Sequence, residues 1–161
     1  MKKYLVIGNP IEHSLSPKLH NYWLNKNKID GDYDKKLLTE EKVEEFLNLN
    51  QNVSGINVTV PFKKTVINYC TELTTLASSS QSVNTIILSN NKIIGDNTDI
   101  YGFEQSLKDL NFDGLNKTAF ILGAGGVASS VVIALNNLGV KNIFISNRTK
   151  NKAEALAKNY N

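Results

Sequence analysis

A cluster of glycines most constrains the fold of this 161-residue chain: Gly123-Ala124-Gly125-Gly126-Val127-Ala128. It follows an apolar run at 118–122, and a helical pattern that reaches Leu138 comes directly after it. In this variant of the dinucleotide fingerprint, the glycines allow a tight turn and let the backbone approach a pyrophosphate at a helix N-terminus. The alternative is a tight turn without a ligand. Because a strand pattern precedes the cluster and a helix pattern follows it, we favour a phosphate-binding loop.

Strand and helix patterns alternate along the whole chain, which predicts an α/β fold with a mostly parallel sheet. The expected strands are 3–7, 33–38, 53–60, 118–122 and 142–146, with a hairpin of 83–88 and 93–95 around Asn90-Asn91. The expected helices are 17–27, 39–49, 61–69, 101–110, the one that ends at Leu138, and 150–161, while 78–82 is expected to be a polar connector. The part after 118 is therefore the first half of a doubly wound dinucleotide-binding (Rossmann) domain, which normally has two such halves.

The end of the last expected strand indicates which dinucleotide would bind. An NAD site usually has Asp or Glu there to hold the ribose hydroxyls, but this chain has Ser146-Asn147-Arg148-Thr149, followed by Lys150 and Lys152. A guanidinium can pair bidentately with a 2′-phosphate, and the lysines add point charge. We therefore predict NADP rather than NAD. A helix start capped by Asn147 or Thr149 is the structural alternative, and both interpretations can hold together.

A second informative segment is Gly55-Ile56-Asn57-Val58-Thr59-Val60-Pro61-Phe62-Lys63. Side chains alternate along a strand, so Asn57 and Thr59 should point to one side. Pro61 stops sheet pairing and suits the first turn of a helix, which places Lys63 in that turn. A cation is unfavourable at the positive end of a helix, which invites a functional explanation. Taken alone, a solvated lysine and a functional lysine are equally supported.

Two further polar segments allow a structural and a functional interpretation. Gly95-Asp96-Asn97-Thr98-Asp99 could simply cap a helix, or it could direct the Asp99 carboxylate into a cleft. In His13-Ser14-Leu15-Ser16-Pro17, Ser16 is a natural N-cap before proline. Alternatively, the hydroxyls of Ser14 and Ser16 could bind an anion together.

The remaining candidates are less specific. Asn84 in Val83-Asn84-Thr85 would more often be a structural amide. Trp23 and Phe46 are expected in the core.

Composition excludes several classes of function. The net charge is +3 with scattered lysines, which suits small anionic ligands and is weak evidence for nucleic acid. Cys70 is the single cysteine, so an internal disulfide and a cysteine metal cluster are excluded, and a reducing cytoplasm is expected. With two histidines, His13 and His20, a metal site is not expected. The apolar run at the N-terminus is too short for a signal peptide or a membrane span.

Together these strings resemble the shikimate dehydrogenase family, whose members reduce 3-dehydroshikimate to shikimate with NADPH in aromatic amino acid biosynthesis. The resemblance runs in order along essentially the whole chain. It rests on G-N-P-I-x-H-S-L-S-P, G-I-N-V-T-V-P-F-K, V-N-T, G-D-N-T-D, G-A-G-G and N-R-T.

The resemblance implies a role for each matching residue. The substrate carboxylate would be bound by Ser14 and Ser16, and the ring hydroxyls by Asn57, Thr59, Asn84 and Asp99. Lys63 and Asp99 would form the catalytic pair. The pyrophosphate would lie on Gly123, Ala124, Gly125, Gly126, Val127 and Ala128, and the 2′-phosphate on Asn147, Arg148, Thr149 and Lys152. The chemistry agrees, because Lys63 can donate a proton to a developing alkoxide while Asp99 orients its ammonium.

The resemblance also implies three regions: a substrate-binding catalytic domain over 1–101, a connecting helix and turn over 102–117, and a partial NADP-binding domain over 118–161. Family members continue through a second nucleotide-binding half and a C-terminal helix that returns to the first domain. We therefore expect a fragment that keeps the substrate half-site and has little activity alone. Ser80-Gln81-Ser82 stands where the family has small residues rich in glycine or alanine.

Two alternatives remain open. One is a quinate/shikimate dehydrogenase relative with different cofactor use, against which Arg148-Thr149 argues. The other is a non-catalytic module that binds shikimate or a nucleotide, against which the presence of both Lys63 and Asp99 argues. The expected partner is a small-molecule substrate, with no nucleic acid and no membrane. An unpaired half-domain exposes a sheet edge, so the sequence also allows a homodimer.

Overall fold

A six-stranded sheet organises the first part of the chain in the computed structural model, which describes residues 1–50 and 52–160. Its order is β2-β1-β3-β5-β6-β4, and the strands are β1 (Lys2–Gly8), β2 (Gly31–Leu37), β3 (Gly55–Val58), β4 (Glu72–Leu73), β5 (Thr85–Ser89) and β6 (Lys92–Asp96). β1 pairs in parallel with β2 and β3, and β4 pairs in parallel with β6. The pairs β3–β5 and β5–β6 are antiparallel. The prediction of an α/β fold with a mostly parallel sheet is confirmed, although β4 was not expected.

The chain divides into two compact units, Met1–Asp96 and Asn97–Asn161, called here the first and the second unit. The expected domain boundaries remain a prediction. Each unit is described by itself.

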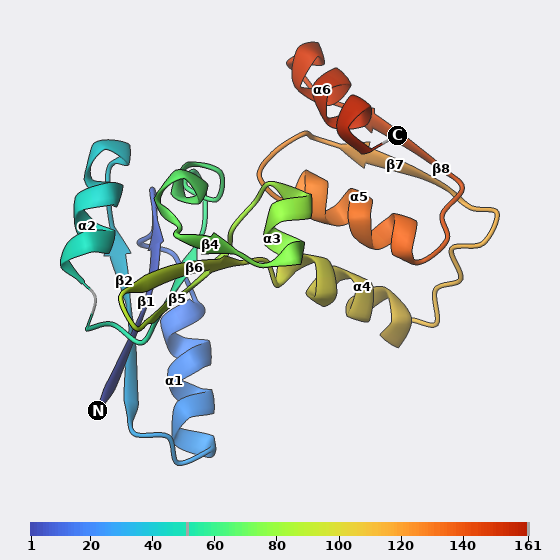
Figure 1. Cartoon of the computed structure of the whole chain (residues 1–161). Helices are drawn as coiled ribbons and strands as arrows, with labels where there is room; N and C mark the ends of the chain where they lie inside the picture. Colours follow the sequence, from blue (N-terminus) through green and yellow to red (C-terminus); the bar gives the residue numbers. More distant parts are fainter. Residues whose placement is uncertain (51, 161) are drawn as a thin grey trace. The chain divides into compact units, whose positions relative to one another are not determined.

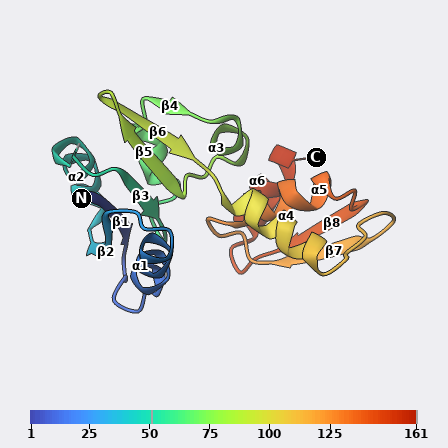
Figure 2. The same ribbon diagram turned by 90° about the horizontal axis from the view of Figure 1, so that it is seen from below.

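Helices cover both faces of the first unit's sheet. On one face lies α1 (Ser16–Lys26). There, Leu24 of α1 and Tyr4 of β1 pack against Val6, Ile11 and Tyr33. On the other, α2 (Val43–Leu49) and α3 (Thr75–Ser80) join the 3-10 helices η1 (Glu40–Lys42) and η2 (Thr65–Tyr69). That face holds the main core, which includes Ile7, Leu47, Ile56, Val58, Phe62, Val66 and Ile86. Figures 1 and 2 show α1 along one face of β1 and β2 and α2 beyond the other face.

The hairpin predicted around Asn90-Asn91 is present. β5 and β6 pair with Ser89 opposite Lys92. Asn90 and Asn91 have φ of 51° and 60°, as both central residues of a type I′ turn require.

The helix expected over 39–49 is present, although its first turn is the 3-10 helix η1 and it becomes α-helical at Val43. Two other local predictions were wrong. The serines at 78–80 are not a connector but the end of α3, where Thr74 caps the Ala77 amide at 3.2 Å and Ala77 and Ser80 are buried. Trp23 is not in the core, because 47% of it is exposed. Phe46, which was also expected in the core, is partly buried and packs against the main core.

The expected helix over 61–69 is also replaced. Residues 61–64 form turns after the cis Val60–Pro61 peptide bond, and η2 begins at Thr65. The Lys63 carbonyl accepts a hydrogen bond from the Val83 amide at 2.8 Å, so it is not part of a helical ladder. Ile67 bonds instead to the Lys64 carbonyl at 3.3 Å, in the i to i+3 pattern of a 3-10 helix. Lys63 therefore precedes the helix and does not lie in its first turn, where the sequence had suggested it would be.

The second unit is a βαβα segment preceded by a helix. Its elements are α4 (Asp99–Asp109), β7 (Thr118–Leu122), α5 (Ala128–Asn137), β8 (Asn142–Ser146) and α6 (Lys150–Tyr160). β7 and β8 pair in parallel as the sequence predicts. Asn161, the end of the expected last helix, lies outside the described residues. α5 and α6 both line a pocket over Ile143 and Ile145, whereas Phe120 and Phe144, on the other side of the strands, stack at 5.1 Å and remain exposed. Figure 1 shows α5 alongside the two strands.

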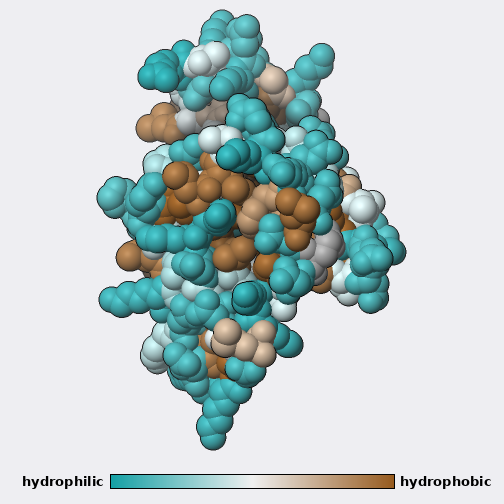
Figure 3. Space-filling model, turned by 90° about the vertical axis from the view of Figure 1, so that its left-hand side faces the viewer, coloured by the Kyte–Doolittle hydropathy of each residue, from teal (hydrophilic) through white to brown (hydrophobic). Residues whose placement is uncertain are grey.

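Large hydrophobic side chains are also exposed in the first unit, among them Leu15, Leu19, Tyr22, Trp23, Leu37 and Leu49. On the face drawn in Figure 3, hydrophobic side chains gather into a patch among hydrophilic ones rather than being spread evenly.

The single cysteine provides a test of packing in the first unit. Cys70 packs against the main core, its Sγ lies 3.3 Å from the Val66 carbonyl oxygen, and burial raises the pKa of its thiol to about 11. An ordinary thiol has a pKa of about 8.5, so at pH 8 the folded chain should react with a thiol reagent roughly 100-fold or more slowly than the urea-unfolded chain. The folded rate should keep rising with pH to about 11. Equal rates for the two states at pH 8 would contradict this packing.

Candidate functional site

Polar side chains gather in the first unit where β1 and β3 end. The two strands are parallel, so their carboxyl ends lie at the same edge of the sheet, where ligands of α/β folds bind. Ser14 and Ser16 follow β1, and Thr59 follows β3. All three line one pocket of about 260 Å³, together with Val6, Pro10, Ile11 and His13. The structure thus brings together three of the residues that the sequence singled out.

Backbone contacts hold the two segments of this pocket together. The Thr59 amide donates to the Ile7 carbonyl at 3.0 Å, and the Asn9 amide donates to the Val60 carbonyl at 2.9 Å. A Cβ added at Gly8 would lie 2.5 Å from the Thr59 methyl carbon, so a glycine is needed there for close approach. Ser14 accepts from the Ser16 amide at 3.3 Å, and Leu15 rather than Ser16 occupies the N-cap position of α1. The expectation that Ser16 caps the helix was therefore wrong, because Ser14 supplies the side-chain oxygen.

Lys63 and Asn84 are joined through the backbone. The Lys63 carbonyl accepts from the amide of Val83, the residue before Asn84. The Asn84 carbonyl in turn accepts from the Val58 amide at 2.8 Å. Lys63 is half-buried, whereas its neighbour Lys64 is exposed. The chain therefore holds Lys63 and Asn84 next to the end of β3, from which Asn57 and Thr59 come.

A chain of side-chain hydrogen bonds connects the two asparagines. The Tyr33 hydroxyl donates to Asn57 Oδ1 at 2.6 Å, and Asn57 Nδ2 donates to Thr85 Oγ1 at 3.3 Å and to the Asn84 carbonyl at 3.4 Å. Thr85 Oγ1 donates to Asn84 Oδ1 at 3.0 Å. Burial raises the pKa of Tyr33 far above its usual range, and a hydrogen bond with the Ser16 side chain offsets part of that rise.

Sequence reasoning missed Tyr33 and Thr85 as parts of the site. The sequence pattern identified both only as strand residues. The alternation of side chains along a strand does not indicate that a hydroxyl reaches an amide on another strand.

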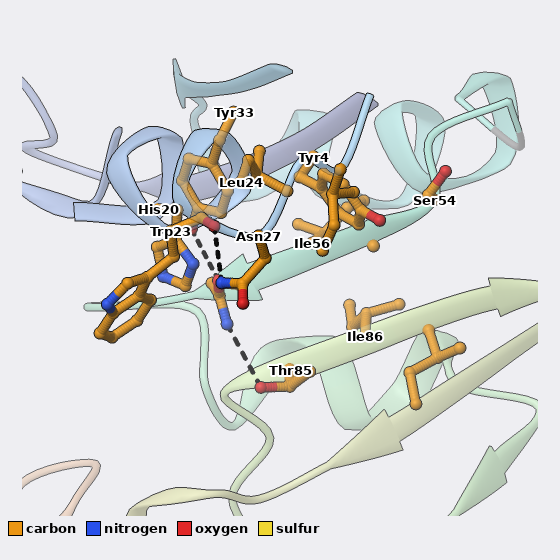
Figure 4. A pocket seen from close by; sticks show the side chains of 14 residues that line it. Tyr4, His20, Trp23, Leu24, Asn27, Tyr33, Ser54, Ile56, Thr85 and Ile86 are labelled. Atoms are coloured by element: carbon orange, nitrogen blue, oxygen red, sulfur yellow. Dashed lines mark hydrogen bonds between the residues drawn. The ribbon is translucent and has the colours of Figure 1, made fainter. Parts of the chain in front are cut away.

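A second pocket, of about 330 Å³, lies between α1 and strands β3 and β5. It is mostly apolar, and its polar lining includes His20, Tyr33, Asn57 and Thr85. The rings of His20 and Tyr33 stack at 4.2 Å between centroids, and burial lowers the pKa of His20. Figure 4 shows His20 and Trp23 next to each other, with Thr85 at the end of a dashed hydrogen bond. Asn57 lines this pocket and belongs to the strand that leads into the smaller one.

In the second unit, Asp99 lies in the first turn of α4. Asn97 Oδ1 accepts from the amides of Asp99 and Ile100 at 3.0 and 3.2 Å, so the start of the helix is capped by Asn97. Asn97 is fully buried, and its Nδ2 donates to Ser130 Oγ of α5 at 3.0 Å. The Asp99 backbone is thereby fixed. Lys63 belongs to the first unit and Asp99 to the second, and the relation between their side chains remains a prediction.

The glycine loop of the second unit has the features of a phosphate cradle. Gly123 directly follows β7 and has φ of +118°, a conformation that residues with side chains rarely adopt, and its amide donates to the Ser146 carbonyl at 2.7 Å. A Cβ added at Gly125 would meet no described atom within 4 Å, so no contact within the described chain requires a glycine there. Open space above a glycine, just before the N-terminus of α5, suits an approaching phosphate.

The loop after β8 lies beside this cradle. Asn147 Oδ1 accepts from the Ala124 amide at 3.1 Å, and its Nδ2 donates to the Thr149 carbonyl at 2.9 Å. One side chain therefore joins the glycine loop to the loop that carries Arg148. Arg148, Thr149 and Lys152 are exposed, so they can reach a ligand. Asn147 therefore has a structural role, but it joins two loops and does not cap the following helix, which was the structural alternative drawn from the sequence.

Comparison with known proteins decides the family. A family model described as the shikimate dehydrogenase substrate binding domain matches residues 6–86, and a model of shikimate / quinate 5-dehydrogenase matches residues 106–161. The chain belongs to the shikimate dehydrogenase family. The resemblance inferred from the six motifs is thus confirmed.

Individual members of the family agree with this assignment. A shikimate dehydrogenase (NADP(+)) of Pelagibacter ubique is 53% identical over 161 residues, which are 99% of this chain and 61% of that protein. The crystal structure of shikimate dehydrogenase from Aquifex aeolicus has a TM-score of 0.95 at 37% identity, covering 99% of this chain and 60% of that one. The Thermus thermophilus enzyme in complex with NADP(H) and shikimate has a TM-score of 0.91 at 30% identity, covering 99% and 61%.

This chain of the shikimate dehydrogenase family thus spans about three fifths of the length of those relatives. In the described residues, no group of three or more His, Cys, Asp or Glu side chains is placed to hold a metal ion. Among the helices that the structure describes, none has both the length and the hydrophobicity needed to cross a bilayer.

Proposed function

We propose that this chain carries the shikimate-binding and NADP-binding parts of an NADP-dependent shikimate dehydrogenase, which reversibly reduces 3-dehydroshikimate to shikimate in the pathway to chorismate and aromatic amino acids. The observation that carries this proposal is the pocket at the ends of β1 and β3. Ser14, Ser16 and Thr59 line it, and Lys63 and Asn84 are held beside the same strand ends. Hydroxyls, amides and one cation are the groups that a polyhydroxylated carboxylate requires.

The roles of these residues follow from their chemistry. Ser14 and Ser16 donate hydrogen bonds to the carboxylate of shikimate, while Asn57, Thr59 and Asn84 bind its ring hydroxyls. Lys63 donates a proton to the alkoxide oxygen as the ketone is reduced, and takes it back in the reverse direction. Asp99 accepts a hydrogen bond from the lysine ammonium and from a ring hydroxyl.

The second unit binds the cofactor in this proposal. Residues Gly123 to Ala128 place backbone amides and a helix N-terminus against the pyrophosphate. Arg148 forms a bidentate pair with the 2′-phosphate, with Asn147, Thr149 and Lys152 around it. NADP supplies the hydride-transferring nicotinamide when it is bound. The open space at Gly125 and the absence of an acidic side chain in Ser146-Asn147-Arg148-Thr149 both fit this cofactor.

Calorimetric titration of the purified chain with shikimate and with NADP, separately and together, tests the proposal. We expect binding of both ligands and little NADP-dependent oxidation of shikimate, because the chain spans about 60% of its relatives. Failure to bind shikimate would contradict the assignment of the first unit. Steady-state oxidation at the rate of a complete enzyme would contradict the expectation of a half-site. The same titrations with quinate in place of shikimate, and with NAD in place of NADP, test the alternative of a quinate/shikimate dehydrogenase relative with different cofactor use.

A non-catalytic binding module is the second candidate. It would bind shikimate with no turnover at all, whereas a remnant of the enzyme should show a slow NADPH-dependent reduction of 3-dehydroshikimate that replacement of Lys63 by methionine removes. The proposal also includes a cytoplasmic location and assembly as a homodimer. Size-exclusion chromatography with light scattering measures the molar mass in solution and so tests the homodimer.

A further inference from the structure

Tyr33 is a buried ionisable side chain that lines the pocket of about 330 Å³ between α1 and strands β3 and β5, and none of the roles above uses it. It is 4% exposed and lies in β2, one of the two edge strands of the sheet. Its hydroxyl is 2.6 Å from Asn57 Oδ1, the shortest side-chain hydrogen bond in the chain of bonds that leads to Asn84.

Two sets of contacts fix the position of Tyr33. The Asn21 side chain of α1 bonds to both backbone groups of Tyr33, with Nδ2 donating to the carbonyl at 2.8 Å and Oδ1 accepting from the amide at 2.9 Å. The phenol ring stacks on His20 with an angle of 4° between the planes. The hydroxyl is therefore held in place before any ligand arrives.

The direction of each hydrogen bond follows from an obligate acceptor. The Asn84 backbone carbonyl can only accept, so the group of Asn57 that faces it at 3.4 Å must be the Nδ2 amide. Asn57 Oδ1 then faces Tyr33, whose hydroxyl must be the donor. Thr85 accepts from Asn57 and donates to Asn84 Oδ1. The short bond from the buried Tyr33 hydroxyl thus anchors a series in which the orientation of each amide depends on its neighbour.

We propose that Tyr33 is a positioning residue for substrate recognition, because it holds the Asn57 amide with its oxygen toward the phenol and its two N–H groups toward Thr85 and the Asn84 carbonyl, and Thr85 in turn orients the Asn84 amide. This inference rests on the proposed function, in which Asn57 and Asn84 bind ring hydroxyls of shikimate. Without the Tyr33 hydroxyl, the Asn57 amide loses its shortest hydrogen bond and can rotate, which releases Thr85 and with it the side chain of Asn84.

Replacing Tyr33 by phenylalanine tests the orientation directly, without a ligand. In wild-type chain labelled with nitrogen-15 and carbon-13, nuclear Overhauser contacts should join the Asn57 side-chain amide protons to the Thr85 side chain. We expect Tyr33→Phe to weaken or abolish these contacts while the midpoint of urea unfolding stays close to that of the wild type. Unchanged contacts in Tyr33→Phe would overturn the proposal.

The matched control is Tyr4→Phe. Tyr4 lies directly opposite Tyr33 on β1 and packs in the same small cluster, but its hydroxyl takes no part in the bonds to Asn57. We expect this variant to leave the amide contacts unchanged. Loss of the contacts in both variants would overturn the proposal, because it would show a general effect of the cluster rather than of one hydroxyl.

Ligand binding then separates this inference from the proposed function. Tyr33→Phe should raise the Kd of shikimate roughly 5- to 30-fold in the wild-type background, the effect of one hydrogen bond. In an Asn57→Ala background it should change the Kd less than about 2-fold, because a residue that acts through Asn57 has nothing left to orient. Equal losses in both backgrounds would overturn the positioning role. If wild-type chain fails to bind shikimate, the proposed function fails, and the amide contacts still decide whether Tyr33 orients Asn57.

Discussion

Replacing Phe62 by alanine is expected to lower the free energy of unfolding of the first unit by about 3–5 kcal/mol. Phe62 is 1% exposed and belongs to the main core of that unit. Its truncation removes apolar contact area and leaves a cavity. Because its amide bonds to the Thr59 carbonyl at 2.9 Å and Lys63 follows it, the same change should loosen the turn that carries the proposed catalytic lysine.

Urea unfolding followed by tryptophan fluorescence measures this effect, since Trp23 is the single tryptophan and lies in α1 of the first unit. Phe62→Leu should cost less than about 1.5 kcal/mol because it nearly conserves volume. Tyr22→Ala, at a side chain that is 58% exposed, should change stability by no more than about 0.5 kcal/mol. A Phe62→Ala chain as stable as the Tyr22→Ala chain would show that Phe62 is not packed as described.

Replacing Arg148 by alanine is expected to raise the Kd of adenosine 2′,5′-bisphosphate about 10- to 100-fold, the loss of hydrogen bonds to a charged group. This compound carries both phosphates that the second unit is proposed to bind and needs no contact with nicotinamide. Affinity for AMP, which lacks the 2′-phosphate, should change less than about 2-fold. Calorimetric titration of both nucleotides at one low salt concentration gives the ratio of variant to wild-type Kd for each nucleotide.

Two variants control this experiment. Arg148→Lys keeps the charge but loses the planar fork, so its Kd should lie between those of the wild type and the alanine variant. Lys141→Ala removes an exposed cation that precedes β8, at the opposite end of that strand from Arg148, and should leave both affinities unchanged. If Arg148→Ala weakened the binding of AMP and of the bisphosphate equally, the assignment of Arg148 to the 2′-phosphate would be wrong.

The sequence predicted the elements that depend on local chemistry. Two asparagines at positive φ turn the β5–β6 hairpin, and glycines open α5 after a strand. Both signals lie within a few residues of the structure they specify. The candidate residues Ser14, Ser16 and Thr59, which the resemblance to the family assigned to one site, do line one pocket.

Elements that depend on distant partners could not be predicted in the same way. The turn at Lys63 replaces a helix because the Lys63 carbonyl is bonded to Val83, on another segment. β4 has only two residues, too few for an alternating pattern. Tyr33 looked like any strand residue, because nothing near it in the sequence indicates that its hydroxyl reaches Asn57.

Under the proposed function, the contacts of Asn147 have a consequence for the choice between nucleotides in the second unit. Its amide is bonded at one end to the glycine loop and at the other to the backbone beside Arg148, so the spacing between these two loops is fixed before binding. A site of fixed spacing selects ligands by the distance between their phosphates. NADP carries phosphates on opposite sides of its adenosine ribose and fits such spacing. ATP carries all its phosphates in one consecutive run, so it can occupy one loop at a time and should compete weakly despite its higher charge.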